Sequence, residues 1–376
     1  FIMSIITMAR LRPSLNKKYI SCDNNSINVR DVKKDIMNRD KIINKDFIFN
    51  EVFDEFSTND ILYESFCNDI ISNLTKKINS TFYVFGQTGT GKTYTIFGTK
   101  KTTGLLELIL NHYKSNNINL KINCIQVYNN KCYDLFNKNA FIIEREYNKI
   151  IQFTNLTDME LDLHNVKDLI SKMINDRYIG ESSKNNQSSR SHIMIKLNLD
   201  GNYIKIIDLA GSEKARHCLN NNKISHNENC KINKDILILK ECLRALKNNL
   251  NHIPYRGSKI TKLLKESFER KEKTYILGTI SPDRDNLNDS INTLNYIIDI
   301  KKLNKKKLNP IKNNNNLKKK LLNLIHKKFD LDFEFIKQQK IILDTLPLNK
   351  LTYKNNFKYL INDEINLLNE IKKINL

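Results

Sequence analysis

The stretch Gly86-Gln87-Thr88-Gly89-Thr90-Gly91-Lys92-Thr93 is a complete phosphate-binding loop. It directly follows residues 81–85, a β-branched and aromatic run typical of a buried strand. The glycines let backbone N–H groups turn toward phosphate oxygens, Lys92 reaches the β- and γ-phosphates, and the Thr93 hydroxyl can hold Mg²⁺ at the start of the next helix. This order of strand, loop and helix predicts a nucleoside triphosphate site.

Strands and helices alternate around this loop. Apolar runs bounded by turn residues predict strands at 2–11, 47–49, 81–85, 120–127, 193–199, 203–209 and 275–280, and 3.6-residue periodicity predicts helices at 61–78, 105–113, 166–177, 231–250 and 258–268. This alternation predicts a three-layer α/β fold, in which helices flank a central, mostly parallel sheet and the ligand binds at the carboxyl ends of the strands. From about residue 301 the sequence changes to a Lys-rich stretch, an Asn run at 313–316 typical of a flexible linker, and leucine-bearing segments that predict helices near 317–328 and 357–374.

Composition restricts the partners of the chain. The 376 residues carry a formal net charge of +21, which indicates an acidic partner, although the general abundance of Lys and Asn accounts for part of the excess. The seven cysteines form no C-x-x-C pair, which favours reduced thiols in a cytosolic protein. No apolar stretch approaches the roughly 20 residues of a membrane span. The first residue, Phe1, indicates a fragment or a start at Met3.

A second nucleotide element follows the strand predicted at 203–209. That strand ends at Asp208, a carboxylate suited to organising Mg²⁺ through water, and it passes into a turn that contains Gly211. Gly211 has no side chain, so its N–H can approach a γ-phosphate. Upstream, residues 185–192 form a loop rich in hydroxyl and amide groups.

Together these segments resemble the kinesin motor family. Asn185-Asn186-Gln187-Ser188-Ser189-Arg190-Ser191-His192 is similar to its first switch, N-x-x-S-S-R-S-H, and Asp208-Leu209-Ala210-Gly211-Ser212-Glu213 to its second, D-L-A-G-S-E. Arg177 lies eight positions before the first switch, as a family arginine does. Arg10-Leu11-Arg12-Pro13 resembles the R-x-R-P motif, and His252-Ile253-Pro254-Tyr255-Arg256-Gly257-Ser258-Lys259 resembles a microtubule-side motif. The resemblance implies a P-loop motor domain at 1–304, followed by a linker and helical tail at 305–376.

The resemblance also implies roles for individual residues around ATP and Mg²⁺. Arg12, Pro13 and Tyr94 flank the adenine, with Tyr94 stacking on it. Thr93 and Ser189 coordinate Mg²⁺, and Asp208 holds its water. Ser188 and the Gly211 N–H face the γ-phosphate and the attacking water, while Arg190 and Glu213 form an ion pair that closes the site and relays a proton. The full set implied to bind ATP is Arg10, Arg12, Pro13, Gly86, Gln87, Thr88, Gly89, Thr90, Gly91, Lys92, Thr93 and Tyr94.

The segment 239–246, which reads L-K-E-C-L-R-A-L, is similar to the depolymerising, internal-motor kinesins. This implies that the helix at 231–250 docks on curved tubulin. Lys231 and Asp235 depart from the family motif N-I-N-K-S, Asn130 stands where most members have Glu, and the loop with Lys33-Lys34-Asp35 is shorter than in that class. The residues implied to bind microtubules are Lys231, Lys234, Lys240, Glu241, Arg244, Tyr255, Arg256 and Lys259.

Several functional alternatives stay open on the sequence. The leading hypothesis is a microtubule-stimulated Mg-ATPase, located in the cytoplasm on microtubules or the spindle, that drives depolymerisation; a plus-end-directed translocating kinesin is the alternative. A hydrolysis-deficient microtubule-binding module predicts damaged catalytic positions, whereas Lys92, Thr93 and both switches are intact. A P-loop NTPase acting on nucleic acid is favoured by the basic charge alone. A homodimer formed as a coiled coil through the tail, or through a neck N-terminal to Phe1, competes with packing of the tail on the motor.

Overall fold

A computed structural model describes residues 5–14, 19–34, 40–147, 150–161, 165–177, 191–212, 223–248, 250–269 and 272–305. Of these, residues 31–34, 40–42, 147, 150, 223–233, 247 and 303–305 are described by their backbone alone. The chain separates into two units, Phe1–Lys307 and Leu308–Leu376, and all elements named below belong to the first. The predicted tail helices lie outside the described residues.

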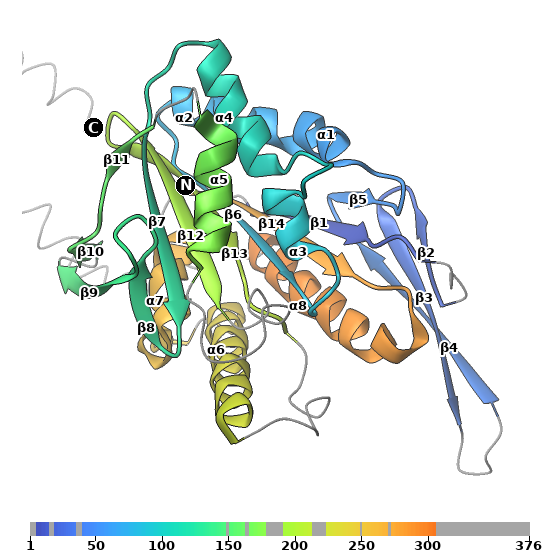
Figure 1. The fold of residues 1–376 in the computed structure, drawn as a ribbon. Coiled ribbons are helices and arrows are strands. Elements are labelled where there is room, and N and C mark those ends of the chain that lie inside the picture. Colours follow the sequence, from blue (N-terminus) through green and yellow to red (C-terminus); the bar gives the residue numbers. More distant parts are fainter. Residues whose placement is uncertain are drawn as a thin grey trace, which may run out of the picture. The chain divides into compact units, whose positions relative to one another are not determined.

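Five parallel strands form one half of the main sheet, with β5 (Glu51–Phe53) at its edge (Figure 1). Their order is β13 (Asn202–Asp208), β6 (Ser80–Gly86), β14 (Lys273–Ile280), β1 (Ile5–Leu11) and β5. Every residue of β6 is buried, as the continuous apolar run predicts for a parallel strand covered on both faces. Because parallel strands end at the same edge of a sheet, the phosphate loop after β6 and Asp208 at the end of β13 lie next to each other.

Antiparallel strands extend the sheet beyond β13. They are β12 (His192–Leu199), β7 (Lys121–Tyr128), β8 (Lys131–Asp134), β9 (Ala140–Tyr147) and β10 (Ile150–Thr154), in that order, with β11 (Met159–Glu160) also paired to β7. A separate three-stranded sheet contains β2 (Ile20–Asp23), β3 (Ser26–Lys34) and β4 (Asp40–Ile48).

Helices cover both faces of the main sheet and enclose two hydrophobic cores. One face carries α1 (Asn59–Leu62), the π-helical turn η1 (Tyr63–Cys67), α2 (Asn68–Thr75), α3 (Lys92–Phe97), α4 (Leu105–Ser115) and α5 (Val166–Asn175). The other carries α6 (Lys223–Lys247), α7 (Lys259–Glu269) and α8 (Leu287–Lys305), with the 3₁₀ turns η5 (Tyr255–Gly257) and η6 (Arg284–Asn286). The predicted three-layer P-loop fold is therefore confirmed.

Several elements differ from the sequence prediction. The predicted helix at 61–78 is interrupted by the π-helical turn η1, and the strand expected at 47–49 is the end of the longer β4. Helix α8 was not predicted, because apolar residues also occupy positions outside its core stripe of Leu287, Ile291 and Leu294 and blur the 3.6-residue period. Among the described residues, the cysteines are free thiols, and no helix is both long and apolar enough to cross a membrane.

Candidate functional site

The backbone of the phosphate loop requires glycine at two kinds of position. Gly86 pairs with Thr279 of β14, and a Cβ on Gly86 would lie 2.3 Å from the Thr279 carbonyl oxygen, so no larger residue fits. Gly91 stands just before α3 with a φ of +103°, a backbone conformation that L side chains rarely adopt. These constraints explain the glycine spacing that the sequence shows.

Lys92 lies inside the curve of this loop. Its side chain is buried, and Nζ donates hydrogen bonds of 2.9 Å to the carbonyl oxygens of both Gly86 and Gln87. The Thr90 hydroxyl fixes the loop by donating to the Gln87 carbonyl oxygen at 2.7 Å, and it contacts the Thr279 hydroxyl at the same distance. A cation held there by backbone dipoles is placed to exchange these contacts for phosphate oxygens.

Asp208 joins the loop to the end of β13. Its Oδ2 accepts a hydrogen bond of 2.9 Å from the Thr93 hydroxyl, and Nη1 of Arg177 lies 3.4 Å from the same oxygen. Oδ1 is buried and has no hydrogen-bond partner among the described residues. A hydroxyl beside a carboxylate with an unused oxygen is an all-oxygen donor set of the kind that Mg²⁺ prefers, so these residues fit the predicted metal.

Arg177 contacts both the Asp208 carboxylate and Ser191. Its Nε and Nη2 donate to the hydroxyl and the carbonyl oxygen of Ser191, at 2.9 and 2.7 Å. Burial lowers the pKa of Arg177, and the charge of Asp208 opposes that shift; a guanidinium starts so high that it stays charged. Sequence spacing singled out Arg177 but predicted no contact for it, since one partner, Ser191, directly precedes β12 and the other, Asp208, ends β13.

The four residues expected at the adenine side fall into two groups. Arg10 is buried and donates to Asn59 Oδ1 at 2.7 Å and Thr95 Oγ1 at 2.9 Å, with its guanidinium 5.2 Å from the Tyr94 ring centroid. It therefore supports the Tyr94 ring from inside the protein. Arg12 is partly exposed, donates to the Gly89 carbonyl oxygen at 2.8 Å, and precedes the exposed Pro13.

Asp283, between β14 and α8, is a site residue that the sequence did not reveal. It forms an ion pair with Arg12 and accepts hydrogen bonds from the hydroxyls of Ser14, at 2.5 Å, and Ser281, at 2.9 Å. The Ser14 hydroxyl, together with Ser281 and Arg12, holds the pKa of Asp283 below its usual range. The carboxylate thus fixes the direction of Arg12 against the phosphate loop.

The second switch begins against the phosphate loop. The Ser212 N–H donates to the Gly86 carbonyl oxygen at 3.1 Å, which places the buried Gly211 beside the loop. The Ala210 N–H donates to Nδ1 of His192 at 3.0 Å. Four predicted residues, namely Ser188, Ser189, Arg190 and Glu213, lie outside the described residues.

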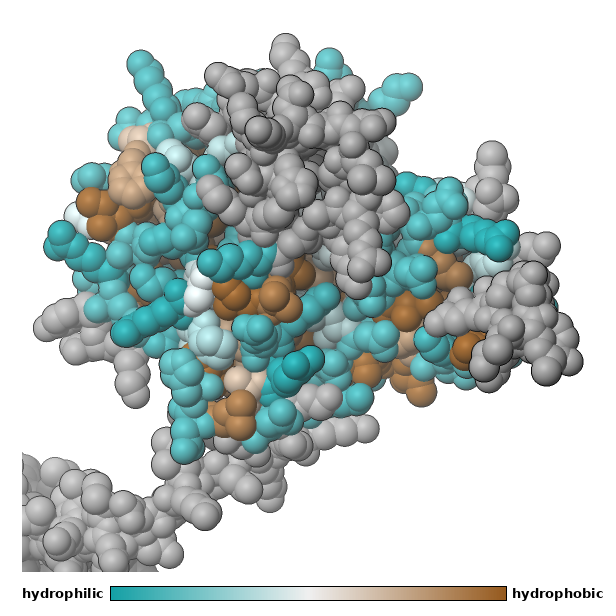
Figure 2. All heavy atoms as spheres, turned by 90° about the horizontal axis from the view of Figure 1, so that it is seen from below, coloured by the Kyte–Doolittle hydropathy of each residue, from teal (hydrophilic) through white to brown (hydrophobic). Residues whose placement is uncertain are grey.

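The predicted partner face of α6 presents a charged stripe. Lys234, Glu241 and Arg244 are exposed at helical spacing, with the apolar Leu237 between them 56% exposed. Lys240 is half-buried and lines a groove against α8 with Arg244. The side chain of Lys231 lies outside the described residues. Seen from below the view of Figure 1, the described surface is mostly hydrophilic with separate apolar patches (Figure 2).

Around α7, the predicted residues differ in their exposure. Tyr255 is buried, and its carbonyl oxygen accepts from the Thr261 hydroxyl at 2.7 Å, so it supports the surface from beneath. The Arg256 side chain is 83% exposed and Lys259 is partly exposed. Both cations contact carboxylates of β9, which the sequence analysis did not single out.

Comparison with known proteins gives consistent matches to a protein family and to individual relatives. The kinesin motor domain family matches residues 10–303. The chain is 32% identical over 329 residues to the kinesin-like protein KIN-13B of Arabidopsis thaliana, and 30% identical over 342 residues to KIN-13A of Oryza sativa subsp. japonica; each match covers 81% of this chain. It is 32% identical over 299 residues to human KIF24, covering 75% of this chain. These matches cover 48%, 42% and 22% of the respective relatives, so the chain spans less than half the length of each.

A solved structure has a similar fold. The segment 391–772 of KIF14, a dimer in a two-heads-bound state with AMP-PNP in complex with a microtubule, matches with a TM-score of 0.70 and 22% identity. The match covers 80% of this chain and 94% of that one.

Proposed function

Because the chain belongs to the kinesin motor domain family, we propose that it is a magnesium-dependent ATPase whose hydrolysis is coupled to tubulin binding. The observation that carries this proposal is the contact between the Thr93 hydroxyl and Asp208, which brings the phosphate loop and the second switch together. Both groups lie where adjacent parallel strands end, the usual place for a ligand in such sheets.

The chemistry proposed for the site follows from these positions. Bound Mg²⁺ would supply charge stabilisation to the phosphates; among the described residues, the Thr93 hydroxyl would coordinate it and the Asp208 carboxylate would hold its water. Lys92 binds the β- and γ-phosphates, and the Gly211 N–H orients the γ-phosphate. Arg12 and Tyr94 bind the adenine side. Glu213 and Arg190 close the site, and Ser188 and Ser189 complete the first switch.

The proposed partner surface is the charged stripe on α6 together with η5 and α7. Its exposed cations complement an acidic surface, and tubulin is the partner chemistry that the family suggests. We place the protein on the microtubule cytoskeleton of the cytoplasm, including the spindle, and propose dimerisation through the tail.

Filament disassembly is the proposed output. The sequence L-K-E-C-L-R-A-L in α6 and the similarity to KIN-13A and KIN-13B support disassembly over translocation. A motor that drives disassembly must bind bent tubulin more tightly than the straight lattice, since equal affinity for both states shifts nothing.

One experiment tests these proposals together. Purified chain is mixed with ATP and labelled, stabilised microtubules while phosphate release and filament length are recorded. We expect a slow basal rate that rises more than about tenfold with microtubules, because tubulin docking is proposed to promote closure of the nucleotide site. We also expect shortening from filament ends. Gliding without shortening would support the translocating alternative. A rate indifferent to microtubules would contradict the motor proposal, and no phosphate release by a chain that still binds microtubules would support the hydrolysis-deficient module.

A further inference from the structure

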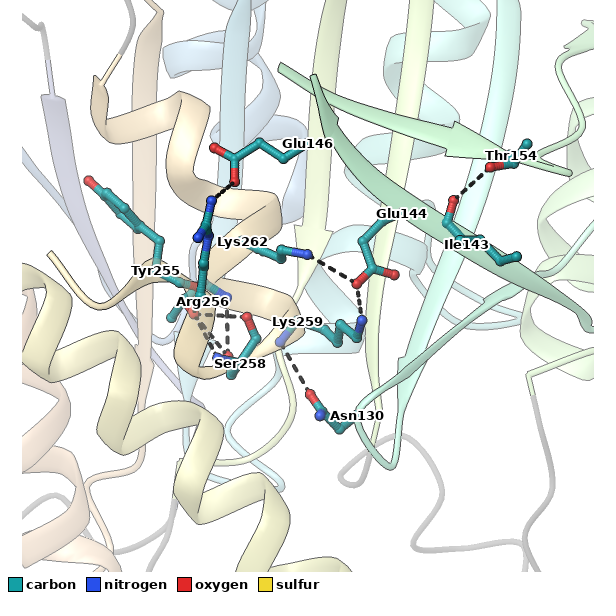
Figure 3. A network of polar contacts seen from close by, with 11 residues as sticks. Asn130, Ile143, Glu144, Glu146, Thr154, Tyr255, Arg256, Ser258, Lys259 and Lys262 are labelled. Carbon is teal, nitrogen blue, oxygen red and sulfur yellow. Dashed lines mark hydrogen bonds and ion pairs between the residues drawn. The ribbon is translucent and has the colours of Figure 1, made fainter. Parts of the chain in front are cut away.

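Strand β9 and helix α7 present matching rows of opposite charge. Glu144 and Glu146 are two positions apart, so they project to the same face of the strand. Lys259, Lys262 and Lys265 are three positions apart, so they share one face of the helix. Figure 3 shows the Glu144 and Glu146 side chains directed at the side chains of α7 and the preceding turn.

Each carboxylate contacts two cations. Glu144, whose side chain is 5% exposed, contacts Lys259 and lies 3.4 Å from Nζ of Lys262. Glu146 lies 3.1 Å from the Arg256 guanidinium and 2.6 Å from Nζ of Lys265. Hydrogen bonds from Lys265 and Arg256 lower the pKa of Glu146, so this carboxylate is charged at neutral pH. The two carboxylates of β9 therefore face four cationic side chains.

The contacts lie along a groove that is open to solvent. It has a volume of about 310 Å³ and is lined by Asn130, Glu146, Arg256, Ser258, Lys259 and Lys262. Two of its lining residues, Arg256 and Lys259, belong to the surface proposed above to meet tubulin. An acidic group that approaches these cations therefore meets them already paired with carboxylates of the same chain.

We propose that Glu144 and Glu146 are an internal competitor for the acidic partner, which lowers the affinity of the α7 surface for tubulin until tubulin carboxylates replace them. This inference rests on the proposed function, because it takes the partner from it. Its physical basis is that binding gains only the difference between the new ion pairs and those already present.

The hairpin does not depend on these ion pairs for its position. Residues 143–147 of β9 pair with β10 and residues 140–142 pair with β8, and the Thr154 hydroxyl donates to the Ile143 carbonyl oxygen at 3.2 Å (Figure 3). Replacement of each carboxylate by its amide preserves the side-chain shape. The double variant Glu144→Gln/Glu146→Gln is therefore expected to keep the fold.

The test compares microtubule affinity across a salt series for the full chain, this double variant, and the control Asp60→Asn/Glu64→Gln. The control makes the same change in net charge at two exposed side chains of α1 and η1, on the other face of the sheet. We expect the β9 variant to bind roughly five- to tenfold tighter than the unchanged chain at low salt, with a steeper loss of affinity as salt rises. The control is expected to change microtubule affinity by less than about twofold, because solvent and salt screen the charges of Asp60 and Glu64 from the α7 surface.

The outcomes separate the two proposals. If the β9 variant binds no tighter than the control, or binds more weakly, the carboxylates orient the cations instead of competing and the inference is wrong. If the unchanged chain does not bind microtubules, the proposed function fails. Polyglutamate then serves as the acidic probe. The β9 variant is again expected to bind it more tightly than the unchanged chain and the control. Thermal melting checks the fold. If the double variant unfolds, Glu146→Gln alone replaces it, because this change removes the contacts of Arg256 and Lys265 with β9. Equal polyglutamate binding by the variant and the unchanged chain would overturn the inference.

Discussion

Nε2 of His192, on β12, lies 3.7 Å from Oδ2 of Asp235, on α6. The other ring nitrogen, Nδ1, accepts a hydrogen bond of 3.0 Å from the N–H of Ala210. In the neutral ring, Nε2 therefore carries the hydrogen and faces the carboxylate. One buried imidazole thus joins the segment after Asp208 to the helix that carries the proposed partner surface.

Asp235→Ala is expected to weaken this connection. The buried Nε2–H then loses a carboxylate that lies 3.7 Å away without forming a hydrogen bond to it, which should lower the free energy of unfolding by less than about 1 kcal/mol. We expect the ratio of microtubule-stimulated to basal ATPase to fall several-fold, while basal hydrolysis changes little. Urea unfolding and steady-state phosphate release measure the two effects. Asp235→Asn keeps an acceptor oxygen and should retain most of the stimulation; equal loss in both variants would argue against this role.

Lys92→Ala and Glu213→Ala should have different effects on nucleotide binding. Lys92 is placed to contact phosphate directly, so its removal should lower affinity for Mg-ATP by at least about 100-fold, as expected for loss of a buried charge-assisted contact. Glu213 is proposed to close the site, so its variant should bind ATP normally, stall hydrolysis and stay on microtubules. A fluorescent ATP analogue measures binding. Equal loss of binding in both variants would contradict the role given to Glu213.

Gly86→Ala should destabilise the protein at the base of the phosphate loop. The added Cβ would meet the Thr279 carbonyl oxygen at 2.3 Å, and backbone cannot yield as a flexible side chain can. We expect a loss of about 1–3 kcal/mol or more in unfolding free energy, with weakened nucleotide binding. Gly201→Ala is the matched control. The φ of Gly201 is +82°, but an added Cβ would have no neighbouring atom within 4 Å. This variant should lower the free energy of unfolding by about 1 kcal/mol and leave nucleotide binding intact. Normal nucleotide affinity in Gly86→Ala would show that the loop tolerates the shift.

Asp283 should make stability depend on pH in the acidic range. Because hydrogen bonds from Ser14 and Ser281 and the charge of Arg12 lower its folded-state pKa, the charged carboxylate stabilises the fold above the unfolded value of about 4. That contribution is lost as pH falls through the lower, folded-state pKa. Asp283→Asn should therefore be less stable than the unchanged chain at pH 7, with the difference shrinking below about pH 4. Chemical unfolding at a series of pH values checks this, and a difference that grows on acidification would have the wrong sign.

Lys240→Ala/Glu241→Ala/Arg244→Ala should abolish filament shortening. These residues lie on α6, on the opposite face of the sheet from α3, the helix that follows the phosphate loop, so Mg-ATP binding should stay within about twofold of normal. Microscopy of labelled filaments and a nucleotide-binding titration measure the two properties. Shortening at an unchanged rate would remove α6 from the proposed disassembly mechanism.

The strand–loop–helix order around residues 86–93 and the turn that follows Asp208 were predictable because each depends on a short run of sequence beside a strand. The fold class followed from the same alternation of strands and helices. The contacts of Arg177 and Asp283 were not predictable in this way: most of their partners lie in segments that flank strands far apart in the sequence, and only the sheet order brings these segments together. The Glu144 and Glu146 contacts needed both the strand period and the position of α7, and periodicity alone cannot pair one segment with another.

The pairing of β1 with β14 has a consequence for how the protein is made. Ile5 is in register with Thr274, and the Arg12–Asp283 contact spans 271 positions of the chain. During translation the phosphate loop leaves the ribosome long before the strand that must lie beside β6 and fix Gly86 and Thr90. Until β14 has been synthesised, nascent chains therefore expose the apolar edges of β6 and β1, and such edges are prone to aggregate. In the proposed function, nucleotide would stabilise the domain only after that point, so it would assist the last stage of folding but not the earlier ones.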